Sequence, residues 1–398
     1  MKFLDLPTEL VHYIVKFLPA ESLSRLSQTC KQLNEVADSD SLWQGLSYRE
    51  YKIGSNKGWN ISYKVMYTKI LRPWHKFLGL KRIELVPYGG LVNVCWAEGE
   101  IQVIRYHSKP GDMAFSKLSR VPLFSLRWNE TVPCIEVVCV QCSYERPAVL
   151  SQMCMFSLVQ CDVRNCYKDH KMKERWWYGV DDSRFRGRCD DHHAIFKWLN
   201  IDKRFDYPLA PLLMPSEADQ ARSPVQLGLY TGDYGSHGVE IINLMFNKKK
   251  PQILEGLKIV GDFNVPAGNI SMTVYLYKPI VLSARDQTSV PGLMLADEQR
   301  TAESFTELLN VSSTNADVLR QPFVMPEGIL DGDRDVPSYC LARYIGLGRI
   351  AGPFYSNPNH CTCHFIKFSD VKFGVMWVEL SSFSMFYKVQ EDFPRSLV

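Results

Sequence analysis

The sequence predicts an α+β protein, with an N-terminal helical unit followed by a mainly antiparallel, barrel-like β domain with insertions. Over residues 3–50, apolar residues recur every three or four positions, as in amphipathic helices. From about residue 86 they alternate instead, in short runs rich in β-branched and aromatic residues and bounded by Gly, Pro and Asn. Few helical runs separate these stretches, which favours an antiparallel barrel or sandwich over a doubly wound sheet.

The composition is that of a globular protein. The chain has 398 residues, of which 46% are hydrophobic and 22% charged, and its length suggests two or three domains. Its net charge of +3 is too small to indicate binding to nucleic acid or to a membrane surface, and we expect neither as a partner. A secretory leader and a bilayer-spanning apolar run are both lacking. We therefore expect a protein of the cytoplasm or the nucleus.

Two apolar stripes define the N-terminal helices. The first comprises Leu10, Val11, Ile14 and Leu18, and the second comprises Leu23, Leu26, Cys30 and Leu33. Pro19 breaks the helix between them. Two short helices cannot bury such wide stripes against each other alone, so either the rest of the chain or a partner must cover them.

The order of landmarks over residues 4–43 resembles an F-box. The landmarks are Leu4-Asp5-Leu6-Pro7-x-Glu9-Leu10, Ile14, Leu18-Pro19, Leu23, Leu26, Cys30-Lys31-x-Leu33-Asn34 and Asp40-x-Leu42-Trp43. The resemblance implies that residues 1–50 dock on the Skp-type adaptor of a cullin-RING ubiquitin ligase, with Trp43 in the unit's own core. The adaptor contacts that it implies are Leu4, Pro7, Leu10, Ile14, Leu18, Leu23 and Leu26. Alternatively, these leucines pack against the β domain.

Residues 51–80 are expected to form a helical linker, and residues 81–398 the β domain. The strands that we expect cover residues 91–96, 101–106, 135–140, 239–246, 270–277 and 375–380. Over residues 270–277 strict alternation predicts one buried and one wetter face. We expect two insertions: a metal-binding one at about 134–200, and a mobile one at about 284–320, where the sequence is polar and weakly periodic.

Several motifs of this β domain are similar to those of the F-box only protein 31 family. They include Val86-Pro87-Tyr88-Gly89-Gly90, Tyr234-Gly235-Ser236-His237-Gly238, Lys258-Ile259-Val260-Gly261-Asp262-Phe263-Asn264, Gln321-Pro322-Phe323 and Phe373-Gly374-x-x-Trp377. The resemblance implies the substrate receptor of a ubiquitin ligase. Such a receptor captures the tail of a cyclin D-like or C-terminally modified protein for ubiquitination and proteasomal degradation.

Two polar turns bracketed by glycines, at residues 234–238 and 261–264, are candidates for the substrate site. Glycine is needed where the chain takes a positive φ or where another backbone approaches closely, and either reason can apply at Gly232, Gly235, Gly238, Gly261 and Gly268. We expect the two turns to meet around a pocket for a chain terminus, lined by Tyr234, Ser236, His237, Asp262 and Asn264. The Asp262 carboxylate would accept hydrogen bonds from an amide-capped terminus and repel a free carboxylate. Alternatively, Asp262 and Asn264 bond their own backbone as ordinary turn residues.

Cysteines cluster between residues 134 and 189. Cys139-x-x-Cys142 and Cys189-x3-His193 are two half-sites that together offer the four ligands of a tetrahedral structural zinc. The family resemblance also implies a zinc here, matching Cys139, Cys189 and His193, whereas Cys142 is inferred from spacing. A swapped ligand or a second zinc remains open, with further candidates in Cys154, Cys161, Cys166 and His170. Alternatively, the cysteines are reduced and buried. The run from His360 to His364 has too few ligands on either strand face.

We expect no catalytic residues. Ser236 precedes His237, but adjacent residues of an extended chain point to opposite faces and cannot form a dyad. Tyr234 also occupies the first glycine position of a nucleophile elbow. Two alternatives to a substrate receptor remain: a zinc-dependent enzyme, which would need an open coordination position, and an F-box protein with a non-degradative scaffolding role.

Overall fold

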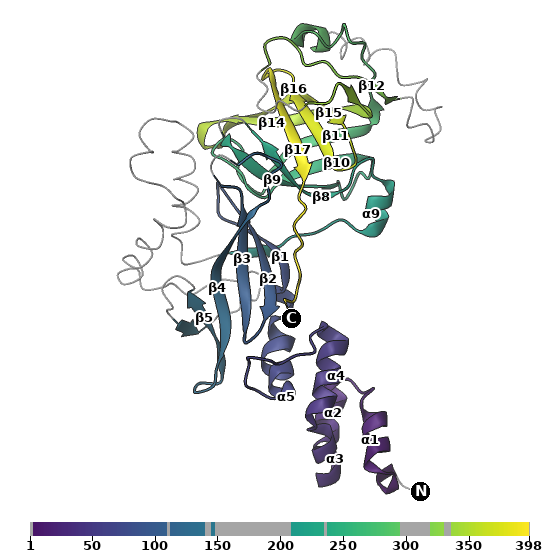
Figure 1. The fold of residues 1–398 in the computed structure, drawn as a ribbon, viewed down its shortest axis with the longest axis vertical. Coiled ribbons are helices and arrows are strands. Elements are labelled where there is room, and N and C mark those ends of the chain that lie inside the picture. The colour runs from purple at the N-terminus through teal and green to yellow at the C-terminus, as the bar shows by residue number, and fades with distance from the viewer. Residues whose placement is uncertain are drawn as a thin grey trace.

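The computed structural model describes residues 3–109, 112–139, 145–147, 208–234, 237–294, 319–329 and 336–397. A helical unit, an open sheet and a closed β barrel follow one another along the long axis of the molecule (Figure 1). The predicted helices followed by antiparallel strands are therefore confirmed. The strands nevertheless form two separate main sheets where we expected one barrel-like domain.

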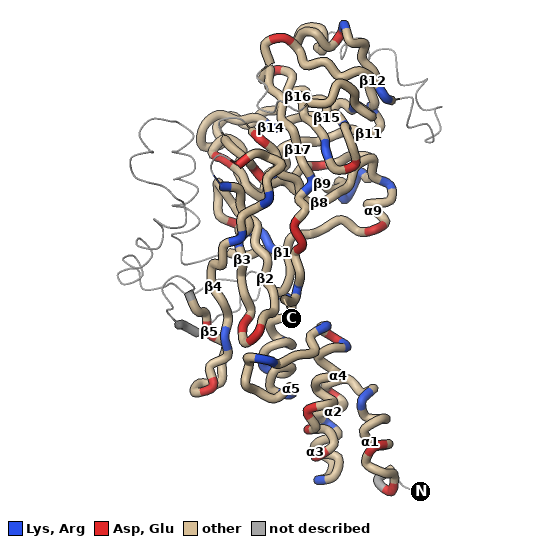
Figure 2. Tube along the Cα trace, viewed as in Figure 1, with Lys and Arg blue, Asp and Glu red and all other residues tan. Residues whose placement is uncertain are grey.

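Acidic and basic residues are interspersed along the helical unit, the open sheet and the barrel (Figure 2). This distribution agrees with the small net charge of the chain. Among the described helices, none is both long and apolar enough to cross a bilayer.

The helical unit has a core of its own. It comprises η1 (Phe3–Asp5), α1 (Thr8–Val15), α2 (Ala20–Leu26), α3 (Lys31–Ala37) and α4 (Asp40–Tyr51). Val11, Leu23 and Trp43 are buried in this core. The indole N–H of Trp43 donates to the carbonyl of Ala37 at 2.8 Å, which satisfies a buried donor. The expected place of Trp43 in the core is thereby confirmed.

A helical segment connects this unit to the open sheet. It contains α5 (Tyr63–Val65), the π-helix η2 (Met66–Leu71), α6 (Arg72–Trp74) and η3 (His75–Phe77). Tyr67 faces the helical unit: its ring lies 5.3 Å from that of Trp43, and its hydroxyl donates to Glu50 at 2.5 Å. Trp74 belongs to the core of the sheet. The segment therefore contributes side chains to both cores.

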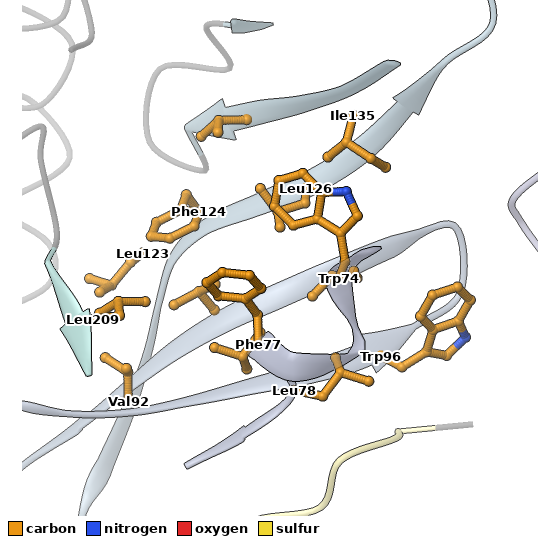
Figure 3. Close-up of a cluster of buried hydrophobic side chains, with 14 of the residues drawn as sticks. Trp74, Phe77, Leu78, Val92, Trp96, Leu123, Phe124, Leu126, Ile135 and Leu209 are labelled. Atoms are coloured by element: carbon orange, nitrogen blue, oxygen red, sulfur yellow. The ribbon is translucent and has the colours of Figure 1, made fainter. Parts of the chain in front are cut away.

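The open sheet has the strand order β6-β5-β4-β3-β2-β1-β7 and is antiparallel throughout. Its strands are β1 (Gly79–Ile83), β2 (Leu91–Ala97), β3 (Glu100–His107), β4 (Ser119–Asn129), β5 (Cys134–Cys139), β6 (Glu145–Pro147) and β7 (Leu209–Pro211). Every residue of β2 is buried, because both faces of the sheet are covered. On one face, Trp74, Phe77 and Leu78 of the helical segment pack against Val92 and Leu126 (Figure 3).

The barrel closes in the order β10-β11-β14-β15-β16-β17-β8-β9, again with antiparallel pairs. Its strands are β8 (Gly228–Asp233), β9 (Val239–Phe246), β10 (Ile253–Lys258), β11 (Ile270–Pro279), β14 (Ala342–Gly352), β15 (Ser356–Lys367), β16 (Lys372–Trp377) and β17 (Ser382–Lys388). On β11, Met272 and Val274 are buried while Thr273 and Tyr275 are partly exposed, so the predicted alternation is confirmed over residues 272–275. It fails at the ends, because Ser271 is buried while Ile270 and Leu276 are partly exposed.

Three further elements surround the barrel: α9 (Glu217–Arg222), β12 (Gln321–Pro322) and β13 (Tyr339–Cys340). A capping box starts α9, because the Ser216 hydroxyl accepts from the Asp219 N–H while the Asp219 carboxylate accepts from the Ser216 N–H. Of the expected insertion at 284–320, residues 295–318 lie outside the described residues.

Residues 389–397 form a C-terminal tail that leaves the barrel and runs along the open sheet, seen in yellow in Figure 1. The side-chain amide of Asn93 donates to the carbonyl of Pro394 at 2.9 Å, and the Trp96 N–H donates to the carbonyl of Arg395 at 2.8 Å. Phe393 packs on the second face of the sheet, where its ring lies 4.8 Å from that of Tyr106. The tail therefore fastens the barrel to the sheet.

Candidate functional site

The loop at 259–268, between β10 and β11, docks on the loop at 84–90 of the open sheet. The Gly261 N–H donates to the carbonyl of Tyr88 at 3.0 Å. A Cβ atom at Gly261 would lie 2.2 Å from the backbone nitrogen of Ala267, so a larger residue cannot fit without moving the backbone. Of the two reasons for a glycine, close approach of another part of the backbone is the one that applies at Gly261. The hydrogen bond from Gly261 to Tyr88 places this loop at the junction of barrel and sheet.

A cluster of three buried charged side chains lies beside this junction. The Nζ atom of Lys258, at the end of β10, is 2.7 Å from Oε2 of Glu240 and 2.6 Å from Oδ2 of Asp262. All three residues are buried, and the ring centre of Tyr234 lies 4.5 Å from the Lys258 nitrogen. Two carboxyl groups therefore face one ammonium in a region from which water is largely excluded.

Mutual attraction keeps Lys258 and Asp262 ionised. Burial by itself would lower the pKa of Lys258, but the charges of Glu240 and Asp262 raise it overall. Burial would likewise raise the pKa of Asp262, but the Lys258 ammonium holds it well below its usual range. Lys258 and Asp262 are therefore both charged at neutral pH. Burial raises the pKa of the Tyr234 hydroxyl, which stays protonated.

The two predicted turns meet at this cluster. The Nδ1 atom of His237 lies 4.0 Å from Oδ1 of Asp262, and the side chain of His237 is 27% exposed. Tyr234 lies deeper, with its hydroxyl 3.4 Å from the Ser271 hydroxyl. Ser236 lies outside the described residues. Of the predicted pocket residues that the structure describes, Tyr234, His237 and Asn264 are partly exposed, whereas Asp262 is buried.

Asp262 itself is 2% exposed and organises the loop from inside. Its Oδ1 atom accepts the N–H groups of Asn264 at 2.5 Å and Val265 at 2.8 Å. The turn-residue alternative for Asp262 is confirmed, and the expectation of a carboxylate open to an incoming chain needs correction, because Lys258 and this turn enclose it. Asn264 does not follow that alternative: its side-chain amide donates to the carbonyl of Ala351, on β14, at 2.9 Å.

Lys258 and Glu240 were missed as members of the site. Glu240 follows Val239 at the start of a largely apolar strand, and Lys258 ends β10 four residues before Asp262. A charged residue in a buried strand requires a partner of opposite charge. That requirement is the signal in the sequence that could have paired these residues.

The predicted adaptor contacts differ in how far they are exposed. Leu10 and Ile14 are 49% and 46% exposed on α1, and the neighbouring Tyr13 and Phe17 are also exposed. The alternative that these two residues pack against the β domain is therefore wrong. Pro7 is exposed, Leu18 and Leu26 are half-buried, and the side chain of Leu4 lies outside the described residues.

Leu23 requires a correction. It is 1% exposed and packs within the helical unit, so it stabilises the unit from inside and presents no surface to a partner. Its place in an apolar stripe could not distinguish a core position from a contact position, because both need the same residue type.

The predicted zinc ligands lie almost wholly outside the described residues. Cys139 ends β5, but its side chain and all of Cys142, Cys189 and His193 lie outside, as do Cys154, Cys161, Cys166 and His170. Elsewhere, in the part of the chain that is described, no group of three or more potential metal ligands occurs. Cys361 and Cys363 both lie in the barrel core, and burial raises the pKa of Cys361 to about 11.

Comparison with known proteins gives separate matches for the helical unit and for the barrel. Residues 3–49 match the F-box-like family model, and residues 212–392 match the model of the cyclin D1 binding domain. F-box only protein 31 of Rattus norvegicus is 27% identical, over 99% of this chain and 86% of that protein. F-box only protein 31 of Homo sapiens is 25% identical, over 98% of this chain and 83% of that protein. The resemblance to the F-box only protein 31 family is confirmed.

The match to the F-box only protein 31 family maps onto the fold. The F-box-like match covers α1 to α4, which carry the exposed Leu10 and Ile14. The cyclin D1 binding domain match covers the barrel and the cluster at Lys258. The open sheet and the helical segment lie between the two matches and connect them.

Proposed function

We propose that this chain is the substrate-recognition subunit of an SCF-type ubiquitin ligase, acting in the cytoplasm or the nucleus. The observation that carries the proposal is the exposed apolar face of α1, on a unit that already has a core of its own. The exposed Leu10 and Ile14 on this face bind a Skp-type adaptor, which connects the chain to the cullin-RING ligase. The chain itself is then a non-catalytic receptor that presents target proteins for ubiquitination and degradation.

The proposal includes the site of substrate capture. The end of a target chain, cyclin D-like or C-terminally modified, binds at the junction of barrel and sheet, where His237 reaches the surface. Glu240 and Asp262 place two carboxyl groups behind it against the single ammonium of Lys258. The negative charge of the Asp262 carboxylate disfavours a free carboxylate terminus more than an amidated one. Asp262 contributes to this selection through its electrostatic field and through the shape that it gives to the loop.

Co-purification with the adaptor tests the first part of the proposal. Leu10→Glu together with Ile14→Glu would bury two charges in the contact, and we expect adaptor binding to weaken by more than about a hundredfold. Val132→Glu is the matched control, because Val132 is an exposed apolar residue between β4 and β5, and this variant should bind normally. Normal binding by the double variant would refute the proposed adaptor face.

Reconstituted ubiquitination distinguishes a degradative receptor from a scaffold. The purified ligase, assembled with this chain, should transfer ubiquitin to a bound target, and the double variant at Leu10 and Ile14 should not. Binding of a target without any transfer in the wild-type complex would favour the scaffolding role instead.

A further inference from the structure

The hairpin formed by β14 and β15 extends beyond the wall of the barrel. Its strand β14 pairs with β11 as far as Gly348, and β15 pairs with β16 from Cys363 onward. Past these points the two strands pair with each other, up to Gly352 opposite Ser356. We call residues 349–360 the arm.

The arm is held against the loop that surrounds the charged cluster. The Tyr355 N–H donates to the carbonyl of Phe263 at 2.9 Å, and the Tyr355 hydroxyl donates to the side-chain oxygen of Asn269 at 3.1 Å. The guanidinium of Arg349 donates to the same hydroxyl at 2.8 Å. With the bond from Asn264 to Ala351, these contacts fix the position of the arm relative to the candidate site.

The tip of the arm presents an aromatic side chain to solvent. Phe354 is 83% exposed, and its backbone lies in the left-handed region with φ 59° and ψ 33°. A residue with a Cβ atom adopts that conformation at a cost, and it persists where the surroundings enforce it. The anchored Tyr355, itself at φ 58°, supplies that enforcement. A strained backbone therefore holds a phenylalanine ring out of the core.

A chain of aromatic contacts connects this ring to the buried site. The ring centre of Phe354 lies 5.4 Å from that of Phe263, and Phe263 lies 5.2 Å from Tyr88. The exposure of these residues falls along the series, from the exposed Phe354 through the half-buried Phe263 to the buried Tyr88. Tyr88 contacts the cluster's loop through the hydrogen bond from Gly261. The aromatic contacts thus extend from the tip of the arm to the loop that carries Asp262.

We propose that Phe354 and Phe263 bind an apolar side chain of the target protein, located within the few residues that precede its captured terminus. The inference rests on the proposed function, because the captured end fixes where the rest of the target chain lies. An extended peptide advances about 3.3 Å per residue, so the position at which an apolar residue improves binding measures the span between the captured end and the arm. The exposed ring favours a Phe or Leu there over a polar residue.

Peptide titrations test this inference. The probes are amidated and free-acid octapeptides of Gly and Ser, each with a single Phe at one of positions two to six from the C-terminus or with none. We expect the full-length wild-type chain to bind one placement about threefold to tenfold more tightly than the peptide without Phe. In Phe354→Ala this positional preference should disappear, while the ratio between amidated and free-acid peptides stays the same.

Two further variants sharpen the result. Phe354→Gly removes the ring and suits the left-handed backbone, so it serves where Phe354→Ala disturbs the arm. Phe115→Ala removes another exposed aromatic ring, which packs on Tyr387 of β17, and should preserve the positional preference. Loss of the preference in both Phe354 variants, with Phe115→Ala unaffected, supports the inference.

The outcomes separate the inference from the proposed function. A preference that persists in Phe354→Gly, or a wild-type chain without any positional preference, overturns the role of the arm. Equal affinity of the wild-type chain for amidated and free-acid ends overturns the proposed terminus selection, whatever happens at Phe354.

Discussion

The ammonium of Lys258 lies 2.6 Å from the carboxylate of Asp262, and this buried ion pair joins the end of β10 to the loop that docks on the open sheet. The second oxygen of Asp262 holds the turn at Asn264 and Val265. One carboxylate therefore both neutralises a buried cation and shapes the loop on which the arm rests. A change at Asp262 should alter folding as well as binding.

The first prediction concerns this ion pair. Asp262→Asn removes one of the two carboxyl groups at Lys258, while Glu240 stays 2.7 Å from the ammonium, so the loss should be below that of an uncompensated buried charge, at about 1–3 kcal/mol. We expect the free energy of unfolding, measured by urea titration, to fall by that amount. Glu98→Gln is the control, because the pair of Lys57 and Glu98 is exposed and should contribute less than about 1 kcal/mol. Equal losses in the two variants would contradict a structural role for the buried pair.

The second prediction concerns pH. Burial lowers the pKa of Lys388, at the end of β17, to about 8, while its ammonium donates to the carbonyl of Leu227 at 2.6 Å. An unfolded lysine has a pKa of about 10.4, so between about pH 8 and pH 10.4 the unfolded chain binds more protons than the folded chain. Stability that depends on this group is therefore lowest below pH 8 and rises with pH through this window.

Lys388→Met makes this effect measurable, because methionine cannot titrate. The difference in free energy of unfolding, wild type minus variant, should increase by about 1–3 kcal/mol between pH 7.5 and pH 10. Using the difference cancels the titration of other groups. A difference that stays constant over this range would show that Lys388 has an ordinary pKa.

The third prediction concerns zinc. We propose one structural zinc per chain, bound by Cys139, Cys142, Cys189 and His193, and elemental analysis of the purified chain should find it. Such a metal contributes on the order of 10 kcal/mol to folding, so Cys189→Ser should lose zinc and lower the melting temperature strongly.

Two comparisons make the zinc experiment specific. Cys30→Ser changes a half-buried free cysteine of the helical unit and should retain zinc. Retention of zinc in Cys142→Ser would assign the fourth ligand to Cys154, Cys161, Cys166 or His170. A wild-type chain purified without zinc would refute the site.

Local patterns predicted the elements better than their assembly. The period of 3.6 located the helices around Leu10 and Leu23, and the alternation at residues 270–277 located β11. The separation into an open sheet and a barrel was missed, because both use the same alternation. Closure of the barrel depends on pairs far apart in the chain, such as Gly232 with Phe386.

At the candidate site, too, local features were predicted and long-range contacts were not. His237 and Asp262 were predicted to meet because polar residues between glycines are typical of functional turns. The burial of Asp262 was not predicted, since it requires Lys258 and Glu240 from two other positions in the barrel. Phe354 was missed as well: an isolated phenylalanine indicates a core position, and its exposure follows from a backbone conformation that the residue type disfavours.

The C-terminal tail makes the order of synthesis matter for this protein. Strands β1 to β5 leave the ribosome first, yet Asn93, Trp96 and Tyr106 contact residues 389–397, which emerge after the whole barrel has been translated. Until then one face of the nascent sheet stays partly uncovered and available to chaperones. A chain truncated by premature termination before residue 389 would keep that exposed surface permanently, and quality control could recognise it as incomplete.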